Sequence, residues 1–289
     1  MKTRISASVS WQMALLLGVS LLLPQAAFAK VAPAKVEKST KAKAGKEVPE
    51  AYEALKQAVV ALSNHKGAAA LAKFNEAIKL SPNYARAYAD RAAVYMLNRQ
   101  YQKALDDCNK AISLNPDLAI GYVNRSWAEI ELNQFARAQD DATKAIALKP
   151  KLAIAYVNRS NALNKLGHYQ EAIEDANKAL EMSKDFPQAL VNRAHAEVHL
   201  NQFEKAIADC DKALEKNPEM ARAYNNRAKA YRHLGKLELA LTDCNRALTL
   251  DPKMSSGYYN RSETYKAIAA QDAQKAQALG FVPDATTTK

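Results

Sequence analysis

The sequence has little of what common catalytic sites require. It contains only 8 glycines in 289 residues, and it has neither a glycine-rich phosphate loop nor a Gly-x-Ser-x-Gly nucleophile turn. His195 and His199 lie four residues apart and His233 follows, but Glu197 is displaced from its place in the HExxH motif of zinc hydrolases. We therefore expect no catalytic residue, no cofactor and no metal, and we interpret the histidines as solvated groups rather than metal ligands.

Cysteine is also scarce, with three residues, Cys108, Cys210 and Cys244. All three take the same place in a repeated pattern described below. Cys210 and Cys244 should therefore lie about a helix-packing distance apart, roughly 8–10 Å. The Cα atoms of a disulfide are rarely more than about 7 Å apart. The sequence predicts three buried free thiols.

The N-terminus carries an apolar run over 11–23 that is short for a membrane span. Lys2 and Arg4 precede it, and Ala27-Phe28-Ala29 follows it, which is the pattern of a secretory signal peptide over residues 1–29. An uncleaved anchor is the alternative, and the absence of a following cysteine argues against a lipid anchor. We expect an exported protein, in the bacterial periplasm or outside the cell, with no stable membrane insertion after cleavage.

Positive charge is in excess, with a net charge of +11. Residues 30–50 contribute six lysines and three glutamates, have no aromatic residue, and are predicted to form a disordered basic linker. The excess suits acidic partners or an anionic envelope surface, although a solvated surface explains much of it. No nucleic-acid-binding motif is present, so nucleic acid is not an expected partner.

What the chain does contain is repetition. Residues 51–254 form six units of 34 residues without an insertion, of which ARAYADRAAVYMLNRQYQKALDDCNKAISLNPDL (85–118) is typical. Its apolar positions follow helical spacing before and after a turn at 98–100, and Pro116 ends the second helix. Each unit is therefore predicted to be two antiparallel helices. A fixed period of this length predicts a solenoid.

The units resemble the tetratricopeptide repeat family. Small residues fill the eighth place, alanine the twentieth and proline mostly the thirty-second, whereas Lys184 replaces one proline and Glu129 and Glu197 replace the aromatic residue near the eleventh place. The resemblance implies an all-α fold, an α-solenoid wound as a right-handed superhelix. The matching alanines and prolines are Ala104, Ala138, Ala172, Ala206, Ala240, Pro82, Pro116, Pro150, Pro218 and Pro252.

The segment 255–282 matches a partial seventh unit. Arg261 takes the seventh place, but the turn between the helices is missing. We expect one helix from about Gly257 to Leu279, ended by Gly280, that caps the last apolar face. Residues 283–289 are predicted to be a disordered tail.

An arginine recurs on the packed face of each first helix, and an aspartate follows it sixteen residues later. A buried arginine needs a carboxylate, because an unpaired buried charge is costly. We expect these residues to pair within each unit and to support the fold; contact of the arginines with a ligand is the alternative. The expected pairs are Arg91–Asp107, Arg125–Asp141, Arg159–Asp175, Arg193–Asp209 and Arg227–Asp243.

An asparagine precedes each of the later arginines and falls about 150° from the packed face on a helical wheel. It is similar to the ladder of groove asparagines that bind peptide main chain in the tetratricopeptide domain of O-GlcNAc transferase. By that resemblance, the amides would donate to and accept from an extended peptide. Asp90 interrupts the column, and water-exposed asparagines without a ligand are the alternative. The column consists of Asn124, Asn158, Asn192, Asn226 and Asn260.

Side chains beside this column set an expected ligand preference. Toward the N-terminal half they are apolar: Met96, Ile120, Val123, Trp127, Ile130, Ile154 and Val157. Toward the C-terminal half they are polar or basic: Arg222, Asn225, Lys229, Arg232, Tyr259 and Lys266. We expect a peptide that is apolar at one end and acidic at the other, although the apolar residues are equally suited to packing between helices.

The sequence therefore predicts an exported, non-enzymatic scaffold that binds an extended segment of a protein or peptide in its concave groove. Three other functions remain open. An assembly factor would dock a folded partner through its convex face, a binder of an anionic envelope polymer would use the linker, and an enzyme would need a metal-dependent activity.

Overall fold

A computed structural model describes residues 48–281 of the chain, and over this range the protein consists of thirteen helices and no strands. The predicted all-α helical-repeat fold is thus confirmed. The chain divides into two compact bodies, an N-terminal body that ends at His168 and a C-terminal body that begins at Tyr169. The expected signal peptide (1–29), nearly all of the expected linker and the expected tail (283–289) lie outside the described residues.

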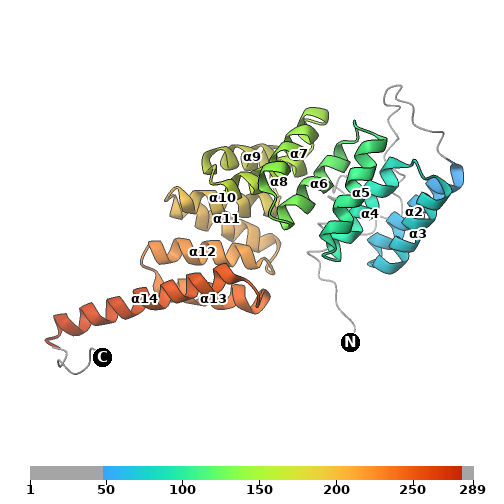
Figure 1. Cartoon of the computed structure of the whole chain (residues 1–289). Helices are drawn as coiled ribbons and strands as arrows, with labels where there is room; N and C mark the ends of the chain where they lie inside the picture. Colours follow the sequence, from blue (N-terminus) through green and yellow to red (C-terminus); the bar gives the residue numbers. More distant parts are fainter. Residues whose placement is uncertain (1–47, 282–289) are drawn as a thin grey trace. The chain divides into compact units, whose positions relative to one another are not determined.

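The N-terminal body holds seven helices that pack in chain order (Figure 1). Each helix contacts the next, and the first helices of successive repeats, α4, α6 and α8, also contact one another. The helices are α2 (Pro49–Ser63), α3 (Gly67–Leu80), α4 (Ala85–Leu97), α5 (Tyr101–Leu114), α6 (Ala119–Glu131), α7 (Phe135–Leu148) and α8 (Ala153–Leu166).

The C-terminal body continues the pattern with six helices. The first helices α10, α12 and α14 pack on one another as well as on their chain neighbours. The helices are α9 (Tyr169–Met182), α10 (Pro187–His199), α11 (Phe203–Lys216), α12 (Ala221–His233), α13 (Leu237–Leu250) and α14 (Ser255–Ala278).

Small side chains allow the helices within each repeat to approach closely. Ala92, Ala104 and Ala111 have no exposed surface, and equivalent alanines recur in the other repeats. The three cysteines are buried and unpaired, as predicted. The turns between paired helices are equally regular, because the fifteenth residue of every repeat from 51 to 254 has positive φ. Glycine adopts this conformation without strain, and it occupies the position in two repeats, as Gly167 and Gly235.

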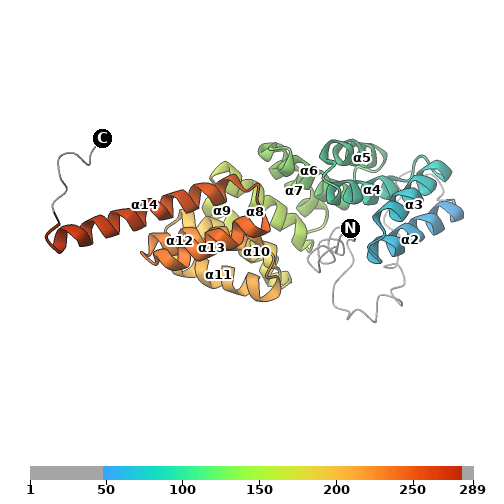
Figure 2. The same ribbon diagram turned by 90° about the horizontal axis from the view of Figure 1, so that it is seen from below.

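The last helix, α14, is unbroken over 24 residues, and Gly280 follows it with φ of 87°. Its first half packs on α12 and α13 through the buried residues Gly257, Asn260 and Thr264. Its second half extends away from both helices (Figures 1 and 2), and nearly all of 269–281 is exposed. Within 48–281, no helix combines the length and apolar character needed to cross a membrane.

Candidate functional site

In four repeats, the arginine at the seventh place forms a two-pronged ion pair with the aspartate sixteen residues later. Arg91 Nε and Nη2 each donate to a different carboxylate oxygen of Asp107 at 2.7 Å. The arginine side chain is 17 % exposed and the aspartate 9 %, so the pair is largely shielded from water. Pairs of the same form join Arg125 to Asp141, Arg193 to Asp209 and Arg227 to Asp243. Arg159 and Asp175 belong to different bodies, and their pairing stays a prediction.

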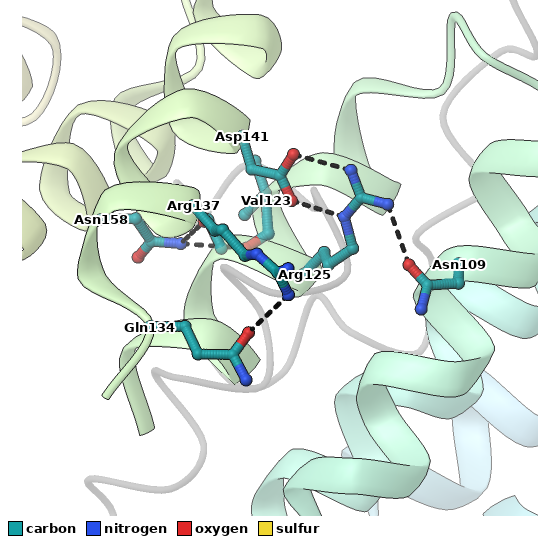
Figure 3. A network of polar contacts seen from close by, with 8 residues as sticks. Asn109, Val123, Arg125, Gln134, Arg137, Asp141 and Asn158 are labelled. Atoms are coloured by element: carbon teal, nitrogen blue, oxygen red, sulfur yellow. Dashed lines mark hydrogen bonds and ion pairs between the residues drawn. The ribbon is translucent and has the colours of Figure 1, made fainter. Parts of the chain in front are cut away.

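Each of these arginines also contacts the preceding repeat. Arg125 Nη1 donates to Asn109 Oδ1 at 2.9 Å while its other nitrogens hold Asp141 (Figure 3). Because Asn109 lies on α5 and Asp141 on α7, one guanidinium joins the second helices of two repeats. Sequence reasoning missed this contact, although its signal is a polar residue sixteen positions before each arginine. The equivalent acceptors are Asn75, Asn177, Asp211, Asn245 and, through its hydroxyl, Thr143.

Two of the pairs stand beside a buried glutamate where the family pattern has an aromatic residue. Glu129 and Glu197 are each 5 % exposed, and Oε2 of each has no hydrogen-bond partner. Burial, and secondarily the charge of Asp209, raises the pKa of Glu197 to about 7. Burial and the charge of Asp141 likewise raise the pKa of Glu129 well above its usual range. These carboxyl groups therefore hold a proton at pH values where a solvated glutamate is ionised.

The asparagine column lies inside the protein, which corrects the outward placement expected from the helical wheel. Asn124 is fully buried and its Nδ2 donates to Ala89 O at 2.8 Å. Asn158 Nδ2 donates in the same way to Val123 O, and Asn226 Nδ2 to Val191 O. Each acceptor lies 35 residues earlier, on the preceding first helix, so the amides tie neighbouring first helices together. Asn192 and Asn260 are also buried, and Asn260 Nδ2 donates to the side chain of Asn225.

The apolar residues expected in the N-terminal half of the groove mostly belong to the core. Met96 is 2 % exposed and Ile130 6 % exposed, because they pack between adjacent helices. Trp127 is half-buried and packs against the buried cluster that includes Ala92 and Ala128. Asp90, which interrupts the asparagine column, is buried and accepts from Arg86 Nε at 2.7 Å. These positions of α4 and α6 therefore offer little apolar surface to a ligand.

The first helices of the C-terminal body become more polar and more exposed along the chain. At the fifth place of the repeat, buried Val191 on α10 gives way to Asn225 on α12 and to Tyr259 on α14, which is 64 % exposed. At the twelfth place, buried Val198 gives way to half-buried Arg232 and exposed Lys266. Exposed Arg222 and half-buried Lys229 add to this basic surface of α12 and α14.

Two histidines, His199 and His233, lie beside the cations of the basic surface. Lys229 Nζ lies 3.3 Å from His199 Nε2, and the His199 ring stacks on Tyr169 at a centroid distance of 4.4 Å. His233 stacks on Phe203 at 4.7 Å. Burial lowers the pKa of both imidazoles. The charge of Lys229 lowers the pKa of His199 further, and the charges of Arg232 and Lys229 lower the pKa of His233 further. Over the described residues, no group of histidine, cysteine and acidic side chains is suited to hold a metal ion.

Sequence comparison identifies one family. Its models, described as Tetratricopeptide repeat, match residues 85–118, 123–189 and 191–255. No curated protein sequence matches this chain.

Similar solved structures are repeat proteins of low sequence identity. The Cut9–Hcn1 hetero-tetramer of the APC/C has a TM-score of 0.67 and 18 % identity over 74 % of this chain, which spans only 42 % of that chain. PilW, described as a widely conserved type IV pilus biogenesis factor, has a TM-score of 0.61 and 21 % identity over 73 % of this chain and 98 % of its own. A tetratricopeptide repeat protein from Parabacteroides merdae ATCC 43184 has a TM-score of 0.57 and 20 % identity. The match covers 80 % of this chain and 94 % of that protein. These likenesses show the fold alone.

Proposed function

Because this chain belongs to the tetratricopeptide repeat family, we propose that it is a non-enzymatic scaffold that binds an extended, acidic segment of a partner protein. The repeat fold supports a role in protein–protein interaction. The observation that carries the finer proposal is the basic surface formed by Arg222, Lys229 and Arg232 on α12 with Tyr259 and Lys266 on α14.

Two cations on this surface, Lys229 and Arg232, differ from those that support the fold. Arg227, on the same helix, pairs with Asp243 and with Asp211. Lys229 and Arg232 form no ion pair within residues 48–281. Cations without a carboxylate partner remain available for charge-assisted hydrogen bonds to an acidic peptide. The exposed ring of Tyr259 offers the same peptide an apolar contact beside the cations.

Selection of peptides from a random display library by the full chain tests this proposal. We expect the enriched peptides to be acidic and to lose binding to the Lys229→Ala/Arg232→Ala variant. The matched control is Lys205→Ala/Lys212→Ala, which removes the same charge from exposed positions of the second helix α11. Peptides that lose binding equally to both variants would show only a general charge effect. Peptides unaffected by either variant would place the binding surface elsewhere, for example on the convex face.

The remaining peptide-contact predictions concern the asparagine column and Trp127. Because the asparagines are buried, their peptide-binding role needs a variant that keeps a small polar group, such as Asn226→Ser. Loss of peptide capture with an unchanged circular dichroism spectrum would support that role. After removal of residues 1–29, Trp127 is the only tryptophan, since the sequence has two and the other is Trp11. A change in tryptophan fluorescence on peptide binding would support contact at Trp127.

We also propose export, on the pattern of residues 1–29. N-terminal sequencing of the protein from its own cells is expected to begin at Lys30. A chain that retains residues 1–29 would instead support the uncleaved anchor.

A further inference from the structure

We propose that His199, Lys229, Arg232 and His233 form a carboxylate-binding subsite that takes up protons when it is occupied. The proposal rests on the function proposed above and assigns that function a specific subsite and a pH dependence. All four residues lie in the C-terminal body, His199 at the end of α10 and the others in the last two turns of α12.

The contact between Lys229 and His199 favours the neutral form of the His199 imidazole. A lysine ammonium is only a donor, so His199 Nε2, at 3.3 Å from Lys229 Nζ, must accept. His199 is then a neutral imidazole with its proton on Nδ1. Protonation of Nε2 would replace this hydrogen bond with a contact between two cations.

Within residues 48–281, no carboxylate forms an ion pair with Lys229 or Arg232. Arg232 Nε is buried and has no hydrogen-bond partner, and a buried donor without an acceptor is costly. The carboxylate that α14 presents to this region, Glu263, accepts from Lys266 Nζ at 2.8 Å. Arg232 is close enough to lower the pKa of Glu263, but only after Lys266, and it forms no ion pair with that carboxylate. An incoming carboxylate would give the half-buried guanidinium of Arg232 the counter-ion that it lacks among the described residues.

Few titratable groups lie close to the imidazoles of His199 and His233. Tyr169 comes from α9, His195 from α10, and Lys229 and Arg232 from α12, while α11 contributes the Phe203 ring. On α14, Glu263 lies near Arg232 and pairs with Lys266. Repulsion from Lys229 and Arg232 therefore adds to burial in keeping the two imidazoles neutral.

A bound carboxylate reverses that balance. It accepts from Lys229 and Arg232, offsets their charge, and frees His199 Nε2 to take a proton and donate to the ligand. The imidazole pKa values then rise on binding, so binding takes up protons and affinity increases as the pH falls. The dependence is at most about tenfold per pH unit for each proton taken up, and it vanishes above the pKa of the occupied state.

Binding of fluorescein-labelled hexaglutamate to the full chain, followed by anisotropy between about pH 6 and 8, tests the subsite. A lysine with an ordinary pKa does not titrate in this range, so the lysines of residues 30–50 add a background that is independent of pH. We expect roughly fivefold tighter binding at the acidic end. His199→Gln/His233→Gln should flatten the dependence, Lys229→Gln/Arg232→Gln should lower affinity at every pH, and Lys205→Gln/Lys212→Gln should keep the wild-type slope.

Further measurements show which kind of carboxylate binds and whether each variant is folded. Hexaglutamate with an amidated C-terminus distinguishes a terminal carboxylate from side-chain carboxylates, and inorganic phosphate as competitor shows whether another anion suffices. Circular dichroism checks that each variant is folded. An unchanged slope in the double-histidine variant overturns the inference but leaves the proposed function intact. Absence of hexaglutamate binding to the wild type overturns the inference, and the display selection then decides the proposed function separately.

Discussion

Asn124 Nδ2 donates a hydrogen bond to the main-chain oxygen of Ala89, which lies 35 residues earlier on the preceding first helix. The asparagine has no exposed surface, so the bond is shielded from water. Asn158 and Asn226 repeat this contact in their own repeats. The asparagine column therefore ties neighbouring first helices together within each body, and Asn226 joins α12, which carries part of the proposed binding surface, to α10.

Loss of this contact should destabilise the array. Asn124→Ala removes the donor and leaves a cavity between α4 and α6, which should lower the free energy of unfolding by about 1–2 kcal/mol. Urea unfolding followed by circular dichroism measures the change. Asn98→Ala, at the exposed residue that follows α4, is the control. A variant as stable as this control would mean that the amide does not support the fold.

Removing one partner of the Arg91–Asp107 pair should destabilise the fold more than removing both partners. Asp107→Ala leaves the guanidinium without its two acceptors and should cost about 2–4 kcal/mol, discounted for the exposed part of Arg91. Arg91→Leu added to Asp107→Ala removes the unpaired charge and should recover part of the loss. Thermal melting of both variants measures the effect. If the double variant melts below the single variant, the arginine has a stabilising role that does not depend on Asp107.

Glu197 should make stability depend on pH. Its pKa in the folded protein, about 7, lies above the ordinary value of 4.5, so the folded state binds more protons than the unfolded state between these values. Stability is therefore highest at low pH and falls as the pH rises through 7. Glu197→Gln should remove this decline and stabilise the protein at pH 8 by on the order of 3 kcal/mol.

Unfolding midpoints between about pH 5 and 8 measure the difference, within the range where folded proteins are generally stable. Glu204→Gln, at an exposed position of α11, is the control and should leave the pH dependence unchanged. Equal profiles for Glu197→Gln and the wild type would show that Glu197 is ionised in the folded protein.

The repeat spacing was sufficient to predict the helix pairs, the turns between them and the long last helix. Each follows from local signals: helical periodicity, the turn segment at 98–100 and its equivalents, and the missing turn after Arg261. The sixteen-residue spacing of Arg91 and Asp107 was visible for the same reason, since both residues lie in one repeat.

The burial of Asn124 could not be read from one helix. A wheel assigns each helix a single packed face, whereas α6 packs on its own second helix α7 and also on the first helices α4 and α8. This second packed face buries Asn124 and Val123, which the wheel placed toward solvent. The predicted exposure of Arg222 and Lys266 on the basic surface is nevertheless confirmed, because both side chains are long enough to reach solvent.

The most direct test of the central claim is photo-crosslinking from single positions of the full chain. A photoreactive phenylalanine analogue at Tyr259, on the proposed surface, is compared with one at Leu239, which is 49 % exposed on the second helix α13. Each is irradiated with an acidic peptide enriched by the display selection. We predict a crosslinked product from position 259 and none from position 239. Crosslinking from position 239 alone would contradict peptide binding on the first helices and would favour docking through the second helices.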